Sequence, residues 1–368
     1  MTDWRATSAL VRAASTAALV ALAALTLGRP DLLVLAAPFA VLGALGIAHA
    51  PRAPLTVDSA LGNLWLHEGQ STRLRVRVAG QAGLEQVTVA LTPERFVACR
   101  PRAGTVSATA SAGAGLDLQI AVSPRRWGVR SVGRTSVGAT SGWAGFRWGP
   151  ASLHDHRFTA LPTTSVFTSA ENPLPVGLIG RNQSRRGGDG SEFYAIRPFQ
   201  PGDRLRRVNW RTTLRTGALH SVGTNAQEDS AVLVVVDAVA DVGASDGVDG
   251  SASSLDTTVR AANALAAHHI QVGDRVSLRV LGRTNLAIGP GAGVRHQRRI
   301  QELIARAEPG WPKTPMGHRL RFRAGAGTVV LVLSPMLTAE INPALVTLAR
   351  RGLTVGAVDT HTPDTLPA

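Results

Sequence analysis

The pattern of hydrophobic and polar positions divides the chain into successive parts, of which the N-terminal one is the most apolar. Two uncharged runs, residues 13–27 and 32–50, are separated by Gly-Arg-Pro-Asp at residues 28–31. Each run is close to the roughly 20 residues that a helix needs to cross a bilayer. Because so short a break makes the helices antiparallel, the pattern predicts a transmembrane helical hairpin over residues 1–52. The alternative is a cleaved signal peptide, with a small-residue site near Ala23 or Ala24, but it leaves the second run unexplained.

Basic residues at the ends of the two runs indicate their orientation. Arg5 and Arg12 lie near the start of the first run and Arg52 follows the second, whereas Arg29 in the break is offset by Asp31. By the positive-inside rule, the side with the excess of arginine is cytoplasmic. We therefore expect a multi-pass protein of the cell membrane with its soluble domains in the cytoplasm. Trp4 is a candidate for the membrane interface.

Residues 53–165 show the two-residue period of β-strands. Apolar and polar residues alternate in residues 74–78, 87–91 and 116–122, with Gly-, Ala- and Ser-rich stretches between them. Short, regular strands with turn signals predict a small β-sandwich. Large rings between the strands are expected to fill its core rather than to stack on a ligand, and these are Trp127, Trp143 and Trp148.

A His-Asp-His sequence at residues 154–156 is the one metal-like pattern of this part. On a strand, both imidazoles point to the same face. Two histidines without a third ligand do not make a zinc site, so we interpret them as surface residues.

Residues 229–368 alternate buried strands with helices. Residues 231–237 and 328–333 are continuous apolar runs, as in parallel strands that are covered on both faces. Further strands are predicted at 275–281 and 353–358, and helices at 255–269, 293–307 and 339–350. This order predicts an α/β domain with an open parallel sheet. The Gly-rich segment 288–293 is interpreted as a loop.

The net charge of +14 by itself would suggest nucleic acid or anionic lipid as a partner, but the composition weakens that inference. Of the 39 basic residues only Lys313 is lysine, which, beside so much Ala and Gly, indicates GC-rich codon usage rather than selection for a basic surface. We therefore do not expect nucleic acid as the partner. Cys99 is the only cysteine, so an intramolecular disulfide is excluded, and we expect it to be a buried apolar residue.

Residues 166–228 form an arginine-rich connector. Pro201-Gly202 is a strong turn signal, and Asp203 is positioned to cap a short helix from residue 204 to about 214. Trp210 is expected to anchor this helix to a core. Its arginines are expected to face outward.

One motif in the connector resembles a known family. The pattern is Arg-x-Phe-x-Pro-Gly-Asp-x-x-Arg-x-Val-x-Trp-x4-Arg-x-Gly over residues 197–217, and it is similar to the hallmark of the domain-of-unknown-function 58 family. Pro198, Phe199 and Val208 replace the family's Glu, Tyr and Ile. Residues 126–129, Arg-Trp-Gly-Val, and the apolar N-terminus extend the resemblance.

The resemblance implies a membrane-anchored protein that ends in a von Willebrand A-like domain. It also implies two partners, a MoxR-type AAA+ ATPase and a transglutaminase-like membrane protein, whose genes commonly lie beside those of the family. No catalytic activity is implied.

Von Willebrand A-like domains place a divalent cation after the first strand, on an Asp-x-Ser-x-Ser sequence. This chain has Asp237, Val239 and Asp241 at those positions, and Ser334-Pro335 follows the third strand. Mg²⁺ requires hard oxygen ligands, and valine offers none. We therefore predict no metal and no cofactor, and we interpret Asp237 as a loop-capping acid.

The sequence contains no catalytic motif, neither Gly-x-Ser-x-Gly, a Walker loop nor His-Glu-x-x-His, so we do not expect an enzyme. The expected function is a membrane-anchored scaffold or adaptor. The alternatives are a metal-dependent ligand-binding module and a binder of nucleic acid or anionic lipid. The candidate site is either a buried interdomain lock or a partner-binding surface, and it consists of Arg197, Pro201, Gly202, Asp203, Arg206, Trp210, Arg211, Arg215 and Gly217.

Overall fold

The structure is a computed structural model that describes residues 3–51, 53–79, 83–110, 115–163, 187–201, 203–225, 231–311, 328–337 and 341–361. The chain divides into two compact units. The first holds residues 1–163, 244–252 and 304–306, and the second holds the rest. The three predicted domain boundaries, at residues 52, 165 and 228, fall outside the described residues and stay predictions.

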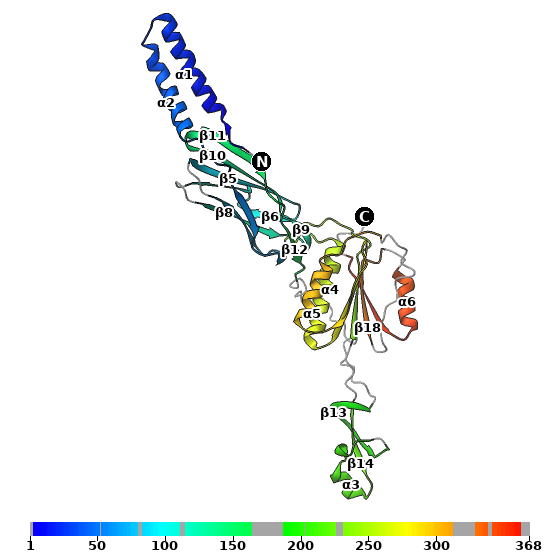
Figure 1. Cartoon of the computed structure of the whole chain (residues 1–368). Helices are drawn as coiled ribbons and strands as arrows, with labels where there is room; N and C mark the ends of the chain where they lie inside the picture. Colours follow the sequence, from blue (N-terminus) through cyan, green and yellow to red (C-terminus); the bar gives the residue numbers. More distant parts are fainter. Residues whose placement is uncertain are drawn as a thin grey trace. The chain divides into compact units, whose positions relative to one another are not determined.

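Two apolar helices lie side by side at the N-terminus (Figure 1): α1, Ser8–Leu27, and α2, Leu32–Ala48. Between them, Gly28 adopts the left-handed conformation and ends α1. α1 has 20 residues and is long and apolar enough to cross a membrane, a property that signal sequences share, whereas α2 is shorter. Many of their large apolar side chains are exposed, among them Leu19, Leu22, Leu25, Val34, Leu35 and Val41.

The remainder of the first unit is built of β-strands, as predicted. One sheet has the order β1-β11-β10-β5-β7, with strands Arg5–Ala6, Phe146–Ser152, Gly133–Ser141, Leu84–Pro93 and Thr105–Thr109. A second has the order β2-β4-β8-β6, with strands Val57–Leu61, Thr72–Val78, Leu116–Pro124 and Val97–Arg100. A third, smaller sheet is β3-β12-β9, with strands Trp65–His67, Arg157–Leu161 and Gly128–Ser131.

One aliphatic core joins the two larger sheets. Strand β4 shows strict alternation of buried and exposed residues, which sends Leu74, Val76 and Val78 into the core. Val87 and Val89 enter it from β5. Cys99 is free and buried, as expected.

Two aromatic predictions in this unit have different outcomes. Trp127 and Trp148 are buried as expected, with 3% and 7% of their surface exposed. Trp143 is not a core residue, because 57% of it is exposed. It lies in a short 3₁₀ turn, η1 (Gly142–Ala144), between β10 and β11.

In the second unit, the described part of the connector, residues 187–201 and 203–225, forms a small arm. Strands β13 (Gly187–Pro198) and β14 (His220–Asn225) pair antiparallel. Between them lie a 3₁₀ turn, η3 (Leu205–Arg207), and one short helix, α3 (Trp210–Thr216).

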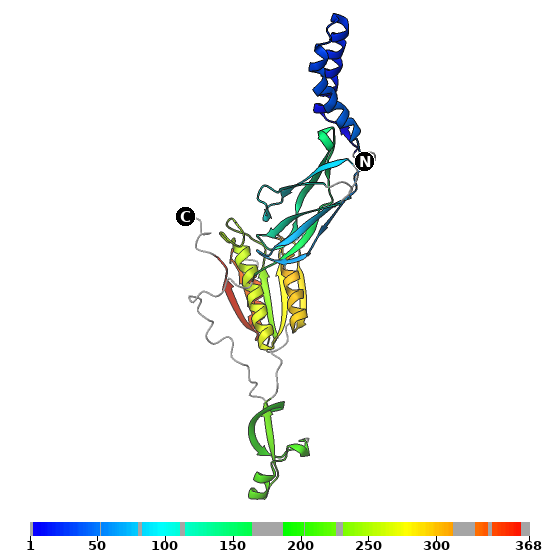
Figure 2. The same ribbon diagram turned by 90° about the vertical axis from the view of Figure 1, so that its left-hand side faces the viewer.

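The α/β domain has a central sheet with the order β17-β16-β15-β18-β19. Strands β15 (Ala231–Asp237), β16 (Arg275–Leu281), β18 (Val329–Ser334) and β19 (Thr354–Asp359) are parallel, which confirms the predicted parallel-rich sheet. Helices α4 (Ser254–Val272) and α5 (Val294–Ile304) cover one face, and α6 (Asn342–Arg350) covers the other (Figures 1 and 2).

The glycine-rich segment of this domain is not a loop, contrary to the sequence interpretation. Strand β17, Leu286–Gly291, pairs antiparallel with β16 at the edge of the sheet. An edge position tolerates glycine and proline because one side of the strand needs no partner. The hydrophobic pattern alone does not reveal it.

Candidate functional site

The turn of the arm is held by an arginine–carboxylate pair. Arg197 at the end of β13 donates from both terminal nitrogens to Asp203, with N–O distances of 2.8 Å and 2.6 Å. The backbone N–H of Gln200 also donates to Asp203, at 2.9 Å. The hydrogen bond from Arg197, and then that from Gln200, lowers the pKa of Asp203. A bidentate pair fixes geometry, and here it fixes the turn that contains Pro201.

Asp203 does not cap a helix, which corrects the prediction of a helix from residue 204. The chain first makes η3, and α3 begins only at Trp210. Asn209 is the cap, since its side chain accepts from the N–H of Thr212 at 3.0 Å. Gly217 ends the helix in the left-handed conformation, with φ of 69°. Gly202 lies outside the described residues.

Trp210 is not anchored in a core, contrary to expectation. Its exposed fraction is 63%, and two leucines beside it in sequence, Leu205 and Leu214, are 73% and 83% exposed. The residue that is buried is Val208, 8% exposed, which forms a β-bridge with Ser221 of β14. The arm therefore keeps its shape through Val208 and its caps, and leaves the tryptophan outside.

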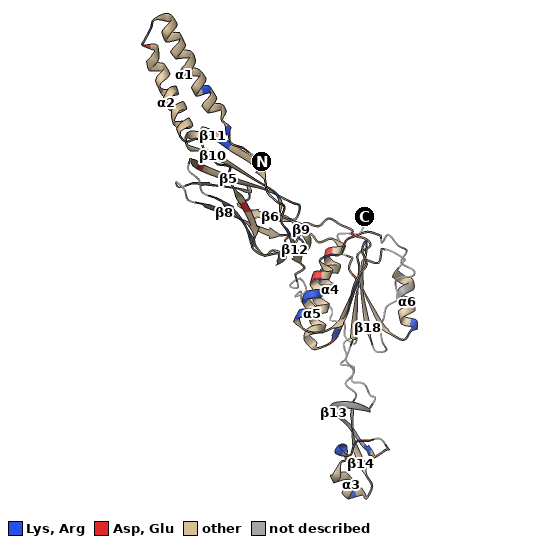
Figure 3. Ribbon diagram, in the orientation of Figure 1, with Lys and Arg blue, Asp and Glu red and all other residues tan. Residues whose placement is uncertain are grey.

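The elements that carry these exposed apolar residues, η3 and α3, also carry arginines, which are blue on the ribbon in Figure 3. Arg206, Arg211 and Arg215 are exposed, and Arg207 is half-buried. We call the set Leu205, Arg206, Trp210, Arg211, Leu214 and Arg215 the arm surface. Exposed tryptophan, leucine and arginine side by side are the composition of a binding surface, because tryptophan and arginine are the residues most enriched at interface hot spots.

The carboxyl ends of the parallel strands form a second polar cluster. Asp237, at the end of β15, is buried and accepts from the hydroxyl of Ser334 at 2.6 Å and from the N–H of Val239 at 3.0 Å. Asp241 accepts from the N–H of Leu255 at 3.2 Å. The acids that stand where a cation site is expected thus cap loops and the start of α4. The described residues contain no group of three or more His, Cys, Asp or Glu side chains suited to a metal ion.

The sequence reasoning missed the hydroxyl groups near these strand ends. Thr258 of α4 and Thr360, which follows β19, share a hydrogen bond of 2.6 Å and are both buried. Ser253 and Asp256 form a reciprocal capping box at the start of α4. The capping box was readable as Ser-x-x-Asp before an apolar helix, whereas the threonine pair is 102 residues apart and has no local signal.

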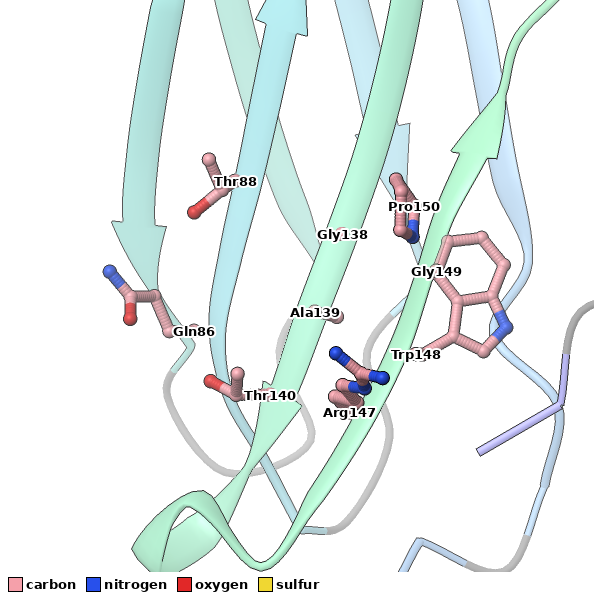
Figure 4. Close-up of a pocket in the computed structure, with 9 residues that line it drawn as sticks. All are labelled: Gln86, Thr88, Gly138, Ala139, Thr140, Arg147, Trp148, Gly149 and Pro150. Carbon is pink, nitrogen blue, oxygen red and sulfur yellow. The ribbon is translucent and has the colours of Figure 1, made fainter. Parts of the chain in front are cut away.

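A shallow cavity of about 250 Å³ lies on the sandwich, over β5, β10 and β11 (Figure 4). Its described lining offers an amide from Gln86, hydroxyls from Thr88 and Thr140, and the guanidinium of Arg147. These groups can bind a polar ligand, but they do not pair a nucleophile with a base.

The histidine pair lies in the segment between β11 and β12 rather than on a strand, which corrects the expected geometry. The rings of His154 and His156 are 5.8 Å apart, edge to face. His156 bonds the hydroxyl of Ser59 at 2.8 Å, and Asp155 accepts from Ser131 at 2.6 Å. Burial, and then the neighbouring His154, lowers the pKa of His156.

These features define a class: an α/β protein with an apolar N-terminus, a β-sandwich and an exposed basic arm. Residues 195–367 match the family described as "Protein of unknown function DUF58". The match begins in β13, before the arm motif, and it confirms the resemblance to this family that the motif predicted. No curated protein is similar enough to count as a relative. Among solved structures, macromomycin is 14% identical and matches 28% of this chain and 99% of its own, with a TM-score of 0.15, which is too low to indicate a shared fold.

Proposed function

We propose that the protein is a non-enzymatic scaffold, anchored in the cell membrane, which binds a partner protein through the arm surface. The observation that carries the proposal is the exposure of Trp210 in an arm that is already ordered without it. An exposed tryptophan between leucines contributes little to folding and costs solubility, so a binding role explains it better than a structural one.

We further propose that α1 and α2 both cross the bilayer as a hairpin, with the soluble units in the cytoplasm. The exposed apolar side chains of both helices support this, because a bilayer provides the apolar surroundings that they lack in water. Each backbone polar group inside such a helix is satisfied within the helix itself. A signal sequence accounts for α1 but not for α2.

The α/β domain is proposed to be von Willebrand A-like, with a cation site that no longer functions. Its support is the sheet order, with an antiparallel edge strand beside parallel strands, and the position of Asp237 at a strand end. Both carboxylate oxygens of Asp237 already accept hydrogen bonds. The domain then serves as a rigid frame.

The proposed partners are a MoxR-type AAA+ ATPase and a transglutaminase-like membrane protein. This assignment rests on the match of residues 195–367 to the family and is a proposal for this chain. The arm surface fits a protein partner with an apolar groove bordered by acids, because its own apolar residues are bordered by arginines.

Affinity capture in mild detergent, with mass spectrometry of the bound proteins, tests the proposal. Trp210→Ala and Arg211→Ala are expected to lower capture of the ATPase by tenfold or more, since a hot spot is worth about 2 kcal/mol or more. The matched controls are Trp311→Ala, which removes a tryptophan of 54% exposure, and Arg295→Ala, which removes an exposed arginine of α5. Equal capture by all four variants contradicts the proposal. Loss of binding after nuclease treatment instead identifies nucleic acid as the partner.

A further inference from the structure

The ends of the two N-terminal helices are held against the turn Gly142–Gly145 of the sandwich. Thr7, which caps α1, donates its hydroxyl to the carbonyl of Ala144 at 2.6 Å and its N–H to that of Gly145 at 3.0 Å. A Cβ added to Gly145 would lie 2.8 Å from the Cα of Gly46 in α2, so the two backbones touch. The turn therefore lies where α1 begins and α2 ends.

The length of α1 indicates the depth of this turn in the proposed membrane-anchored state. Its 20 residues span about 30 Å, which is the thickness of the hydrocarbon core. If α1 fills that core, its cap Thr7 lies at the boundary between acyl chains and headgroups. The turn that contacts Thr7 lies at the same depth.

Trp143, at the tip of this turn, has an unusual conformation for its residue type. It has φ of 57°, in the left-handed region, and Ala144 beside it has φ of 49°. Such backbone costs free energy in residues other than glycine, and it is found most often at functional sites. The result here is that 57% of the tryptophan is exposed rather than packed. Trp4, the candidate from the sequence, packs against the sandwich core instead.

Two arginines next to this turn face each other. Arg5 of β1 lies directly opposite Arg147 of β11 in the antiparallel register, and both are exposed. Among the described residues, neither forms an ion pair. Like charges directly opposite on two strands are destabilising unless an anion lies nearby.

We propose that Trp143, Arg5 and Arg147 form a lipid contact: the indole enters the interfacial layer and the two guanidinium groups bind anionic phospholipid headgroups. Tryptophan favours this layer because its ring is apolar and its N–H is polar. Arginine binds phosphate oxygens with two parallel hydrogen bonds. The inference rests on the proposed membrane anchoring and adds a second lipid-binding element, which comes from a loop about 130 residues after the first helix begins.

Quenching by brominated lipids tests this contact on the full chain. The protein is reconstituted into vesicles of phosphatidylcholine and phosphatidylglycerol, with bromine either just below the headgroups or near the bilayer centre. Trp143 is one of seven tryptophans, so the wild type is compared with Trp143→Phe. We expect shallow bromine to remove more fluorescence from the wild type than from the variant, with a smaller difference for deep bromine. Trp311→Phe, which also removes an exposed tryptophan, is expected to leave the intensity lost to shallow bromine unchanged.

The possible failures are distinguishable. If the wild type does not float with the vesicles in a density gradient, the proposed anchoring is wrong. If it floats and Trp143→Phe loses as much intensity to shallow bromine as the wild type, the lipid contact is wrong and the anchoring stands. A second measurement addresses the arginines: phosphatidylglycerol should raise the melting temperature of the wild type more than that of Arg147→Gln. An equal rise in both refutes the headgroup contact.

Discussion

Ser334→Ala tests whether the strand-end carboxylate is a structural group or a remnant that still binds metal. The Ser334 hydroxyl donates to Asp237 at 2.6 Å and accepts from the N–H of Met336 at 3.0 Å. Both Ser334 and Asp237 are buried, so water does not replace the lost hydroxyl. A hydrogen bond to a charged group is worth about 1.5–3 kcal/mol and one between neutral groups about 1 kcal/mol. We therefore expect a loss of about 2–4 kcal/mol.

This loss is measurable as a change in melting temperature. For a domain of this size, 1 kcal/mol corresponds to about 2–4 °C, so Ser334→Ala should lower the midpoint by about 5–15 °C. The matched control is Ser277→Ala in the neighbouring strand β16, whose hydroxyl donates only to the backbone carbonyl of Val232, at 3.2 Å. It should cost about 1 kcal/mol.

Metal addition completes this test. Because Val239 supplies no oxygen ligand and the carboxylates of Asp237 and Asp241 are held by hydrogen bonds from the protein, millimolar Mg²⁺ or Mn²⁺ should leave the melting temperature of the wild type unchanged. A bound ion at a hundred times its dissociation constant would stabilise the protein by about 2.7 kcal/mol. A rise of that size, abolished by Asp237→Ala, refutes the reasoning. So does a Ser334→Ala variant that melts with the wild type.

Three other predictions concern separate parts of the chain. Val208→Ala should destabilise the arm by about 1–2 kcal/mol, measured as faster amide exchange in β14, whereas Trp210→Ala should leave that exchange unchanged. Faster exchange in Trp210→Ala and unchanged exchange in Val208→Ala would show that Trp210, and not Val208, anchors the arm. The lowered pKa of His156 means that the unfolded chain binds the proton more readily, so stability should fall as pH decreases below about 6.5, and His156→Gln should reduce that fall. If the stability of the wild type and of His156→Gln depends on pH in the same way, His156 is not the cause of the loss of stability at low pH. Alkaline phosphatase fused to the C-terminus should be inactive, and an active fusion would reverse the proposed topology.

The predictable parts of the structure were those that a local period determines. Alternation identified β4, and a continuous apolar run ending in an acid identified β15. The errors concern groups whose surroundings come from distant residues. Trp143 and Trp210 are large apolar side chains whose burial depends on residues distant in sequence, and both are exposed in the structure. Asp203 has the local features of a helix cap, but Arg197 of the preceding strand binds it more strongly.

The way the first strand enters the sandwich determines how the sandwich would move if the helices are anchored in a membrane as proposed. β1 belongs to the large sheet, and a single residue, Thr7, separates its last residue from the first residue of α1. A domain that is attached to its anchor through a flexible linker samples many orientations, which lowers the effective concentration of its binding surface at a partner. This connection has no such linker, so in the proposed membrane-anchored state the sandwich would keep one face toward the bilayer. Under the proposed anchoring, any rotation of the helix pair would turn the sandwich with it, and a neighbour that binds the helices within the membrane would thereby reorient the sandwich outside it.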